Sequence, residues 1–72
     1  MYKYELEIKG MMCSMCEAHI NDVVRRNFDV KKLKSNHKKN LTTFISNEII
    51  DENLLKEAIS KTGYEVTKIK YE

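Results

Sequence analysis

The sequence predicts an α+β sandwich, in which two helices cover one face of a four-stranded antiparallel sheet. Three observations support this prediction. The chain opens with a strand-like alternation, two segments have the periodicity of amphipathic helices, and a polar turn in the middle of the chain joins two further extended segments. In chain order these elements read β-α-β-β-α-β, and we expect them to form a single domain over residues 1–72.

The first strand is predicted over residues 2–9. Its apolar side chains alternate with lysines and glutamates, which is the period of two of a half-buried strand, and Gly10 ends it. The polar side chains are expected to face water on the open side of the sheet. The apolar positions are Tyr2, Tyr4, Leu6 and Ile8.

A helix is predicted after a short loop that carries both cysteines. Its apolar positions recur at helical spacing, so that one stripe faces the sheet. These positions are Cys16, Ile20, Val23, Val24 and Phe28. Cys16 is therefore expected in the first turn of the helix.

A hairpin, a second helix and a last strand complete the chain. Residues 30–35 and 41–46 are extended and are joined by the polar turn 36–40. Asp51 fits an N-cap with Ile50 outside it as a hydrophobic staple, and Gly63 is typical of the residue just past a helix end. The apolar stripe of this helix is Leu54, Leu55, Ala58, Ile59 and Thr62. Residues 64–71 form the closing strand, and the complete order is that of the ferredoxin-like fold.

Composition limits the functions that this domain can have. A chain of 72 residues has room for one small core, and 42% hydrophobic with 33% charged residues is ordinary for a folded domain. The net charge of +2 is small, and no apolar run approaches the length of a membrane span or a signal-peptide core. We therefore expect a cytoplasmic protein with one site and no insertion into a membrane.

Soft sulfur is concentrated at a single point of the chain. Both cysteines, Cys13 and Cys16, lie two residues apart after Gly10, and three of the four methionines surround them. In a reducing compartment this spacing indicates a metal or redox site. A position at a helix N-terminus favours the thiolate of Cys16, whereas Cys13 on the loop is more accessible. Two thiolates satisfy Cu(I), which accepts near-linear coordination, whereas Zn(II) takes four ligands.

Other chemistries of the cysteine pair leave one alternative open. A thiol-disulfide redox protein of the thioredoxin type uses a cis-proline, and this chain has no proline. A zinc site needs further ligands, and His19, three residues after Cys16, is placed to join the two cysteines on Zn(II) or Cd(II). The simpler interpretation of His19 is a solvent-facing helix residue, and that of His37 is a residue of the polar turn. Met11 is interpreted as an apolar plug that packs the loop onto the core, with a thioether ligand as the alternative.

A cluster of lysines raises the separate question of a nucleic-acid-binding module. The predicted sheet lacks the aromatic-rich strand of RNA-binding modules, and the total charge is slight. The lysines are better interpreted as solubilising an edge strand, so we expect no nucleic-acid partner. They are Lys31, Lys32, Lys34, Lys38 and Lys39.

Two sequence motifs resemble those of a known family. Residues 10–16, Gly-Met-Met-Cys-Ser-Met-Cys, look like the G-M-x-C-x-x-C signature of heavy-metal-associated domains, and residues 58–66 are similar to the A-I-x-x-x-G-Y-x-V ending of that family. The resemblance covers nearly the whole chain. The chain departs from the family pattern in having Phe28-Asp29-Val30 where a glycine usually precedes the valine, and Asn27 where the first helix usually keeps a leucine. A third departure, Glu17-Ala18-His19, keeps Zn(II) or Cd(II) open as the metal.

The resemblance implies a function as well as a fold. Members include small copper chaperones and the N-terminal domains of copper-transporting P-type ATPases, which implies Cu(I) held by Cys13 and Cys16 and Met11 as a core anchor. Tyr64 would lie close to the metal, where its hydroxyl shields the site and tunes the thiolates. Implied partners are a copper-transporting P-type ATPase or its metal-binding domain, or a copper-responsive repressor. The chain would act as a monomer or a metal-bridged homodimer, without catalysis, because metal transfer is ligand exchange.

Overall fold

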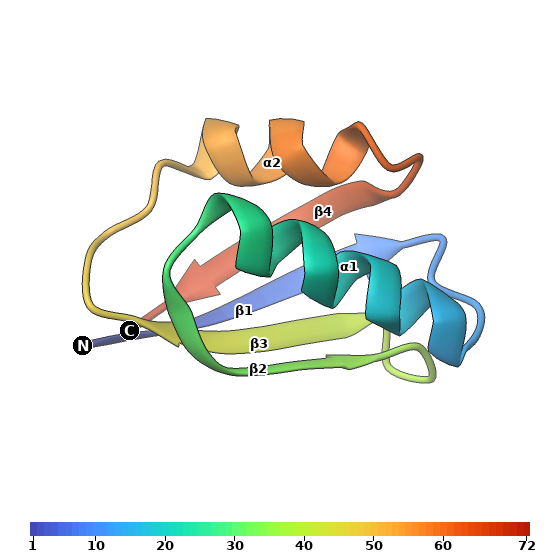
Figure 1. Cartoon of the computed structure of the whole chain (residues 1–72), viewed down its shortest axis with the longest axis horizontal. Coiled ribbons are helices and arrows are strands. Elements are labelled where there is room, and N and C mark those ends of the chain that lie inside the picture. Colours follow the sequence, from blue (N-terminus) through green and yellow to red (C-terminus); the bar gives the residue numbers. More distant parts are fainter.

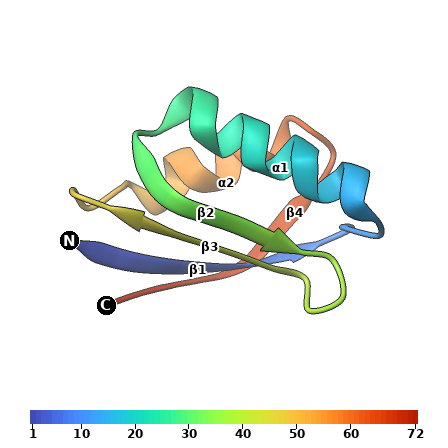
Figure 2. The same ribbon diagram turned by 60° about the horizontal axis from the view of Figure 1, so that its bottom comes forward.

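The computed structural model describes residues 1–72, and Figure 1 shows their arrangement. The elements are β1 (Tyr2–Lys9), α1 (Ser14–Asn27), β2 (Val30–Asn36), β3 (Leu41–Ser46), α2 (Glu52–Ser60) and β4 (Glu65–Tyr71). The strands form one antiparallel sheet in the order β2-β3-β1-β4. Both helices lie on the same face of this sheet (Figure 2). The predicted element order and the ferredoxin-like fold are therefore confirmed.

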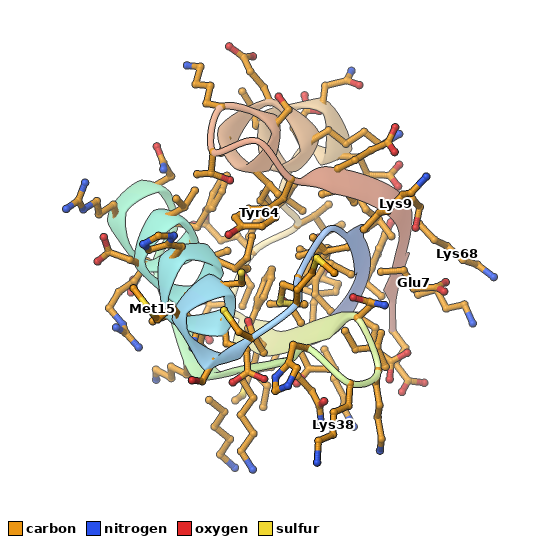
Figure 3. All side chains as sticks on the ribbon, turned by 90° about the vertical axis from the view of Figure 1, so that its right-hand side faces the viewer. Glu7, Lys9, Met15, Lys38, Tyr64 and Lys68 are labelled. Atoms are coloured by element: carbon orange, nitrogen blue, oxygen red, sulfur yellow. The ribbon has the colours of Figure 1, made fainter.

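The side chains of β1 alternate between the helix-covered face of the sheet and its solvent-facing side. Tyr4, Leu6 and Ile8 are buried under the helices, as the period of two predicts. On the open face, Glu5 pairs in register with Lys70 of β4, and Glu7 pairs with Lys68. Figure 3 shows Glu7 and Lys68 on this side of the molecule. Opposite charges in directly paired positions favour this register of β1 and β4.

The core has an aromatic end and an aliphatic end. At the end distant from the cysteines, the ring of Tyr4 stacks on Phe44 and on Tyr71, with both centroid distances at 5.1 Å. The hydroxyl of Tyr4 accepts a hydrogen bond from the Ile50 N–H at 2.8 Å, so the buried tyrosine keeps a polar partner. The buried apolar residues are Tyr4, Leu6, Ile8, Met11, Ile20, Val24, Phe44, Leu55, Ile59 and Val66.

The second helix begins as predicted and is shorter than its apolar pattern. The Asp51 side chain accepts a hydrogen bond from the Asn53 N–H at 2.8 Å, which confirms the N-cap. The helix ends at Ser60, and Gly63 takes up a left-handed φ of 93° in the turn that follows. Neither this helix nor α1 is long and apolar enough to span a bilayer.

Four details of the predicted elements were wrong. Thr62, predicted in the apolar stripe of the second helix, lies beyond the end of α2 and is exposed. Leu54 is 54% exposed, because a helix of nine residues turns only one narrow stripe, Leu55 and Ile59, fully toward the sheet. Phe28 is an extended residue beyond the end of α1, with φ −138°, and packs against the core from there. Tyr64 precedes β4 and does not belong to it.

We expect adjacent leucines of α2 to differ sharply in their contribution to stability. Leu55→Ala empties a fully buried position and is expected to cost about 2–5 kcal/mol of the free energy of unfolding. Leu54→Ala, the matched control one residue away, is expected to cost less than about 1 kcal/mol. Urea denaturation of both variants measures the difference, and equal losses would contradict the observed orientation of α2.

Candidate metal centre

The two cysteines lie at one end of the molecule, where β1 runs into α1. Gly10 has φ 105°, a left-handed conformation that L side chains rarely adopt. A Cβ atom at this position would also lie 3.2 Å from Cδ1 of Tyr64, a closer approach than packed atoms normally make. Figure 3 views the molecule from this end, with Tyr64 extending from the start of β4 toward α1. Gly10 thus provides both the turn and the space for the tyrosine ring.

The methionines of the loop divide between the interior and the surface. Met11 is 3% exposed and belongs to the core, which confirms that it is an apolar plug and anchor. Met12 is 83% exposed and Met15 is exposed as well. The loop is therefore held to the core by one side chain, while the residues on either side of Cys13 face solvent.

The structure brings the two cysteine thiols together. The Sγ atoms of Cys13 and Cys16 are 3.4 Å apart, and both cysteines are free thiols. Cys13 is exposed at the N-cap of α1, with no side-chain capping bond, and its carbonyl accepts hydrogen bonds from the N–H groups of Cys16 and Glu17. Cys16 is half-buried in the first turn of the helix, as predicted. The pair is accessible from the side of Cys13.

The environment of Cys16 favours its thiolate. Its pKa is lowered from 9.0 to about 7, chiefly by a hydrogen bond from the backbone of Met12 and then by hydrogen bonds from the side chains of Tyr64 and Cys13. The sequence led us to expect an acidic Cys16 because of the helix N-terminus. The larger cause, the Met12 backbone, was missed because it depends on the path of the loop. Cys16 is thus substantially ionised near neutral pH.

Tyr64 is one of the groups that lower the pKa of the inner thiol by hydrogen bonding, after the Met12 backbone. The bond with Cys16 raises the pKa of Tyr64, so its hydroxyl keeps its proton and remains a donor when Cys16 is ionised. The ring is half-buried beside Gly10. The effect on the pKa of Cys16 agrees with the tuning role that the resemblance implies for Tyr64.

The two histidines have different surroundings. His19 is exposed on α1, and no group of three His, Cys, Asp or Glu side chains in this structure is arranged to hold a metal ion. His37, expected to be a simple turn residue, donates from its backbone N–H to Glu17 Oε2 at 2.7 Å and from Nδ1 to the same oxygen at 2.6 Å. The pKa of Glu17 is lowered by these bonds, the backbone bond first. No sequence signal identifies this contact, because twenty residues separate the partners.

Comparisons with known proteins support the fold. No family model and no curated protein matches the chain. Among solved structures, a copper-binding domain from HMA7, a P-type ATPase, matches with a TM-score of 0.82 and 22% identity, over 97% of this chain and 95% of that one. The N-terminal domain of ZntA in its Zn(II) form matches with a TM-score of 0.79 and 20% identity, over 90% of this chain and 88% of that one.

A third structure adds a complex between two proteins. A chain of the Atx1-Cu(I)-Ccc2a complex matches with a TM-score of 0.75 and 24% identity, over 94% of this chain and 97% of that one. These likenesses extend over nearly the whole chain. The chain has the fold of the heavy-metal-associated domains, as the resemblance of its motifs predicted.

We expect Tyr64→Phe to raise the pKa of Cys16 from about 7 toward the ordinary thiol value, because the variant removes a hydroxyl that stabilises the thiolate. The ultraviolet absorbance of the thiolate, followed against pH in the reduced protein, measures the change. Tyr2→Phe is the control, since Tyr2 lies at the other end of β1. An unchanged titration in Tyr64→Phe would show that the tyrosine hydroxyl does not stabilise the Cys16 thiolate.

The stability of the reduced, metal-free protein is expected to rise with pH between about 7 and 9. The pKa of Cys16 is about 7 in the folded chain and 9.0 in the absence of its partners, so the unfolded chain binds more protons in this interval. The stabilisation is complete above the upper value and is lost as the pH falls through the lower one. Chemical denaturation at several pH values tests this slope, which Cys16→Ser should flatten.

Proposed function

We propose that this chain binds a soft metal ion, Cu(I) in the first place, between Cys13 and Cys16 and passes it to a partner by thiolate exchange. The observation that carries the proposal is the pair of thiols 3.4 Å apart at an exposed end of the fold, one of them with a pKa of about 7. Soft monovalent ions prefer thiolate ligands, and two are enough for Cu(I).

The spacing of the two sulfur atoms fits a shared metal ion after a small movement. With metal–sulfur bonds of about 2.3 Å, two thiolates lie roughly 3.8 Å apart at a tetrahedral angle and roughly 4.6 Å apart in a linear arrangement. The pair therefore needs to open from 3.4 Å. Cys13 supplies this movement, because it is exposed and its side chain caps nothing, whereas Cys16 is held by its hydrogen bonds.

Transfer follows from the open side of the site. An incoming thiolate approaches the metal beside Cys13, forms a three-coordinate intermediate and replaces the bonds to Cys13 and Cys16 one at a time. The exposed side chains of Met12 and Met15 present a soft, adaptable surface at this point. No general base or substrate cavity is needed for ligand exchange, so we propose a carrier and not an enzyme.

The proposed partner is a second domain of the same fold on a metal-transporting P-type ATPase. Two of the matching structures support this class of partner, one being a copper-binding domain of a P-type ATPase and the other a complex assembled around Cu(I). Exchange needs reduced thiols on both domains, so we propose that the chain and its partner domain meet in the cytoplasm. A copper-responsive repressor is the second class of partner with a thiolate site.

A second candidate function is a Zn(II) or Cd(II) carrier in which His19 completes the ligand set. The likeness to ZntA in its Zn(II) form favours this candidate. His19 lies one helical turn beyond Cys16, so its ring would have to rotate toward the thiols for both cysteines and the imidazole to bind one ion.

Competition between Cu(I) and Zn(II) for the reduced protein tests the assignment. We expect Cu(I) to bind at one equivalent and to displace Zn(II), Cys13→Ser and Cys16→Ser each to weaken Cu(I) binding by at least about a hundredfold, and His19→Ala to change it by less than about threefold. A chromophoric Cu(I) chelator reports the affinity. Tight Zn(II) binding that depends on His19, together with weak Cu(I) binding, would replace the copper carrier by the zinc candidate.

A further inference from the structure

The carboxylate of Glu17, next to the proposed metal ligand Cys16, is hydrogen-bonded to His37 in the turn between β2 and β3. Glu17 follows Cys16 directly in the first turn of the helix, and its Oε2 accepts two hydrogen bonds from His37, at 2.7 Å from the backbone N–H and 2.6 Å from Nδ1. Both side chains are partly buried. Two short bonds to one ionised, partly shielded oxygen are expected to be stronger than the exposed contact of Arg26 with Asp22 on the same helix.

A second polar contact lies one helical turn further along the same face of α1. The hydroxyl of Ser35 in β2 donates to Asn21 Oδ1 at 2.7 Å and lies 2.8 Å from the hydroxyl of Thr42 in β3. Glu17 and Asn21 are four residues apart, so they lie on one side of the helix. This side of α1 therefore meets β2 and its turn through paired polar groups in fixed directions.

The turn that holds Glu17 is itself fixed to the strand that leads into the metal loop. The N–H of Ile8, near the end of β1, donates to the carbonyl of Asn40 at 2.9 Å. Residues 37–40 thus contact both sides of the loop, with α1 on one side through His37 and β1 on the other through Asn40. The position of Cys16 relative to the Met12 backbone and Tyr64 depends on where this first helical turn lies.

We infer that Glu17 and His37 are positioning residues of the metal site: their two hydrogen bonds hold the first turn of α1, and with it Sγ of Cys16, against the β2–β3 turn. The part that this positioning plays in metal transfer rests on the proposed function. In the proposed carrier the Glu17–His37 pair supplies neither of the two thiolate ligands. It keeps Cys16 as the stationary ligand while Cys13 moves to open the site and to release the ion.

Three variants of Glu17 separate the hydrogen bonds from the charge. Glu17→Ala removes both. Glu17→Gln removes the charge and keeps an oxygen acceptor for both N–H groups of His37, and Glu17→Asp keeps the charge and withdraws it by one methylene. Asp22→Ala is the matched control, because it removes a carboxylate of the same helix that makes only an exposed contact. The readouts on the reduced full chain are the thiolate titration without metal and the rate of Cu(I) loss to a chromophoric chelator.

We expect Glu17→Asp, which keeps the charge, to raise the pKa of Cys16, and both Glu17→Asp and Glu17→Ala to speed Cu(I) loss by about tenfold, since a charge-assisted hydrogen bond contributes roughly that factor or more. Glu17→Gln, which keeps an oxygen acceptor but loses the charge assistance, should speed Cu(I) loss by less than Glu17→Ala, and Asp22→Ala should change neither readout. A Glu17→Asp variant that behaves like the unaltered protein would assign the effect to charge alone and overturn the inference.

Further outcomes distinguish this inference from the proposed function. Unchanged thiolate titrations in Glu17→Asp, with a lowered melting temperature alone, would overturn the positioning role and leave the pair a purely structural contact. If the unaltered protein fails to bind Cu(I), the proposed carrier function fails, whereas the titration of the metal-free variants still decides whether Glu17 positions Cys16.

Discussion

The burial of Met11 is the constraint on which the thiol end of this protein depends. A loop between a strand and a helix normally lies on the surface and moves, because its backbone seeks water. Here one apolar side chain of the loop belongs to the same buried core as Ile8 and Ile20, and the cysteine that follows two residues later remains exposed. The fold thus holds the start of the loop and the start of α1 in place while Cys13 stays exposed between them.

This arrangement separates the residues that stabilise the fold from those that do its chemistry. The stacked rings of Tyr4, Phe44 and Tyr71 lie at the opposite end of the sheet, where Tyr4 and Phe44 are fully buried and far from the thiols. The sulfur groups at the other end contribute little to the core apart from Met11. A change in the ionisation of Cys16 therefore acts on a small part of the structure. The domain tolerates an exposed pair of thiols because the interactions that stabilise it lie mainly elsewhere.

The features that sequence reasoning predicted correctly are those encoded within one or two turns of chain. The alternation of β1, the cap at Asp51 and the anchoring role of Met11 each follow from neighbouring residues. Leu54 was placed wrongly because an apolar pattern does not say how many residues of a short helix the sheet will cover. The Glu17–His37 contact depends on how the β2–β3 hairpin is aligned, and that register shifts between Lys31 and Lys34 in a way that periodicity does not encode.

Gly10 and Tyr64 show why two distant parts of the sequence have to agree at this site. A glycine after β1 is explained by its φ of 105° alone, and a tyrosine before β4 by its place at the start of a strand. The 3.2 Å approach between a Cβ at residue 10 and the tyrosine ring links the two positions, because a larger residue would displace the ring from Cys16. The tyrosine hydroxyl then lowers the pKa of the thiol only where residue 10 lacks a side chain. The glycine of the motif therefore contributes, through Tyr64, to the acidity of Cys16 as well as to the turn that presents it.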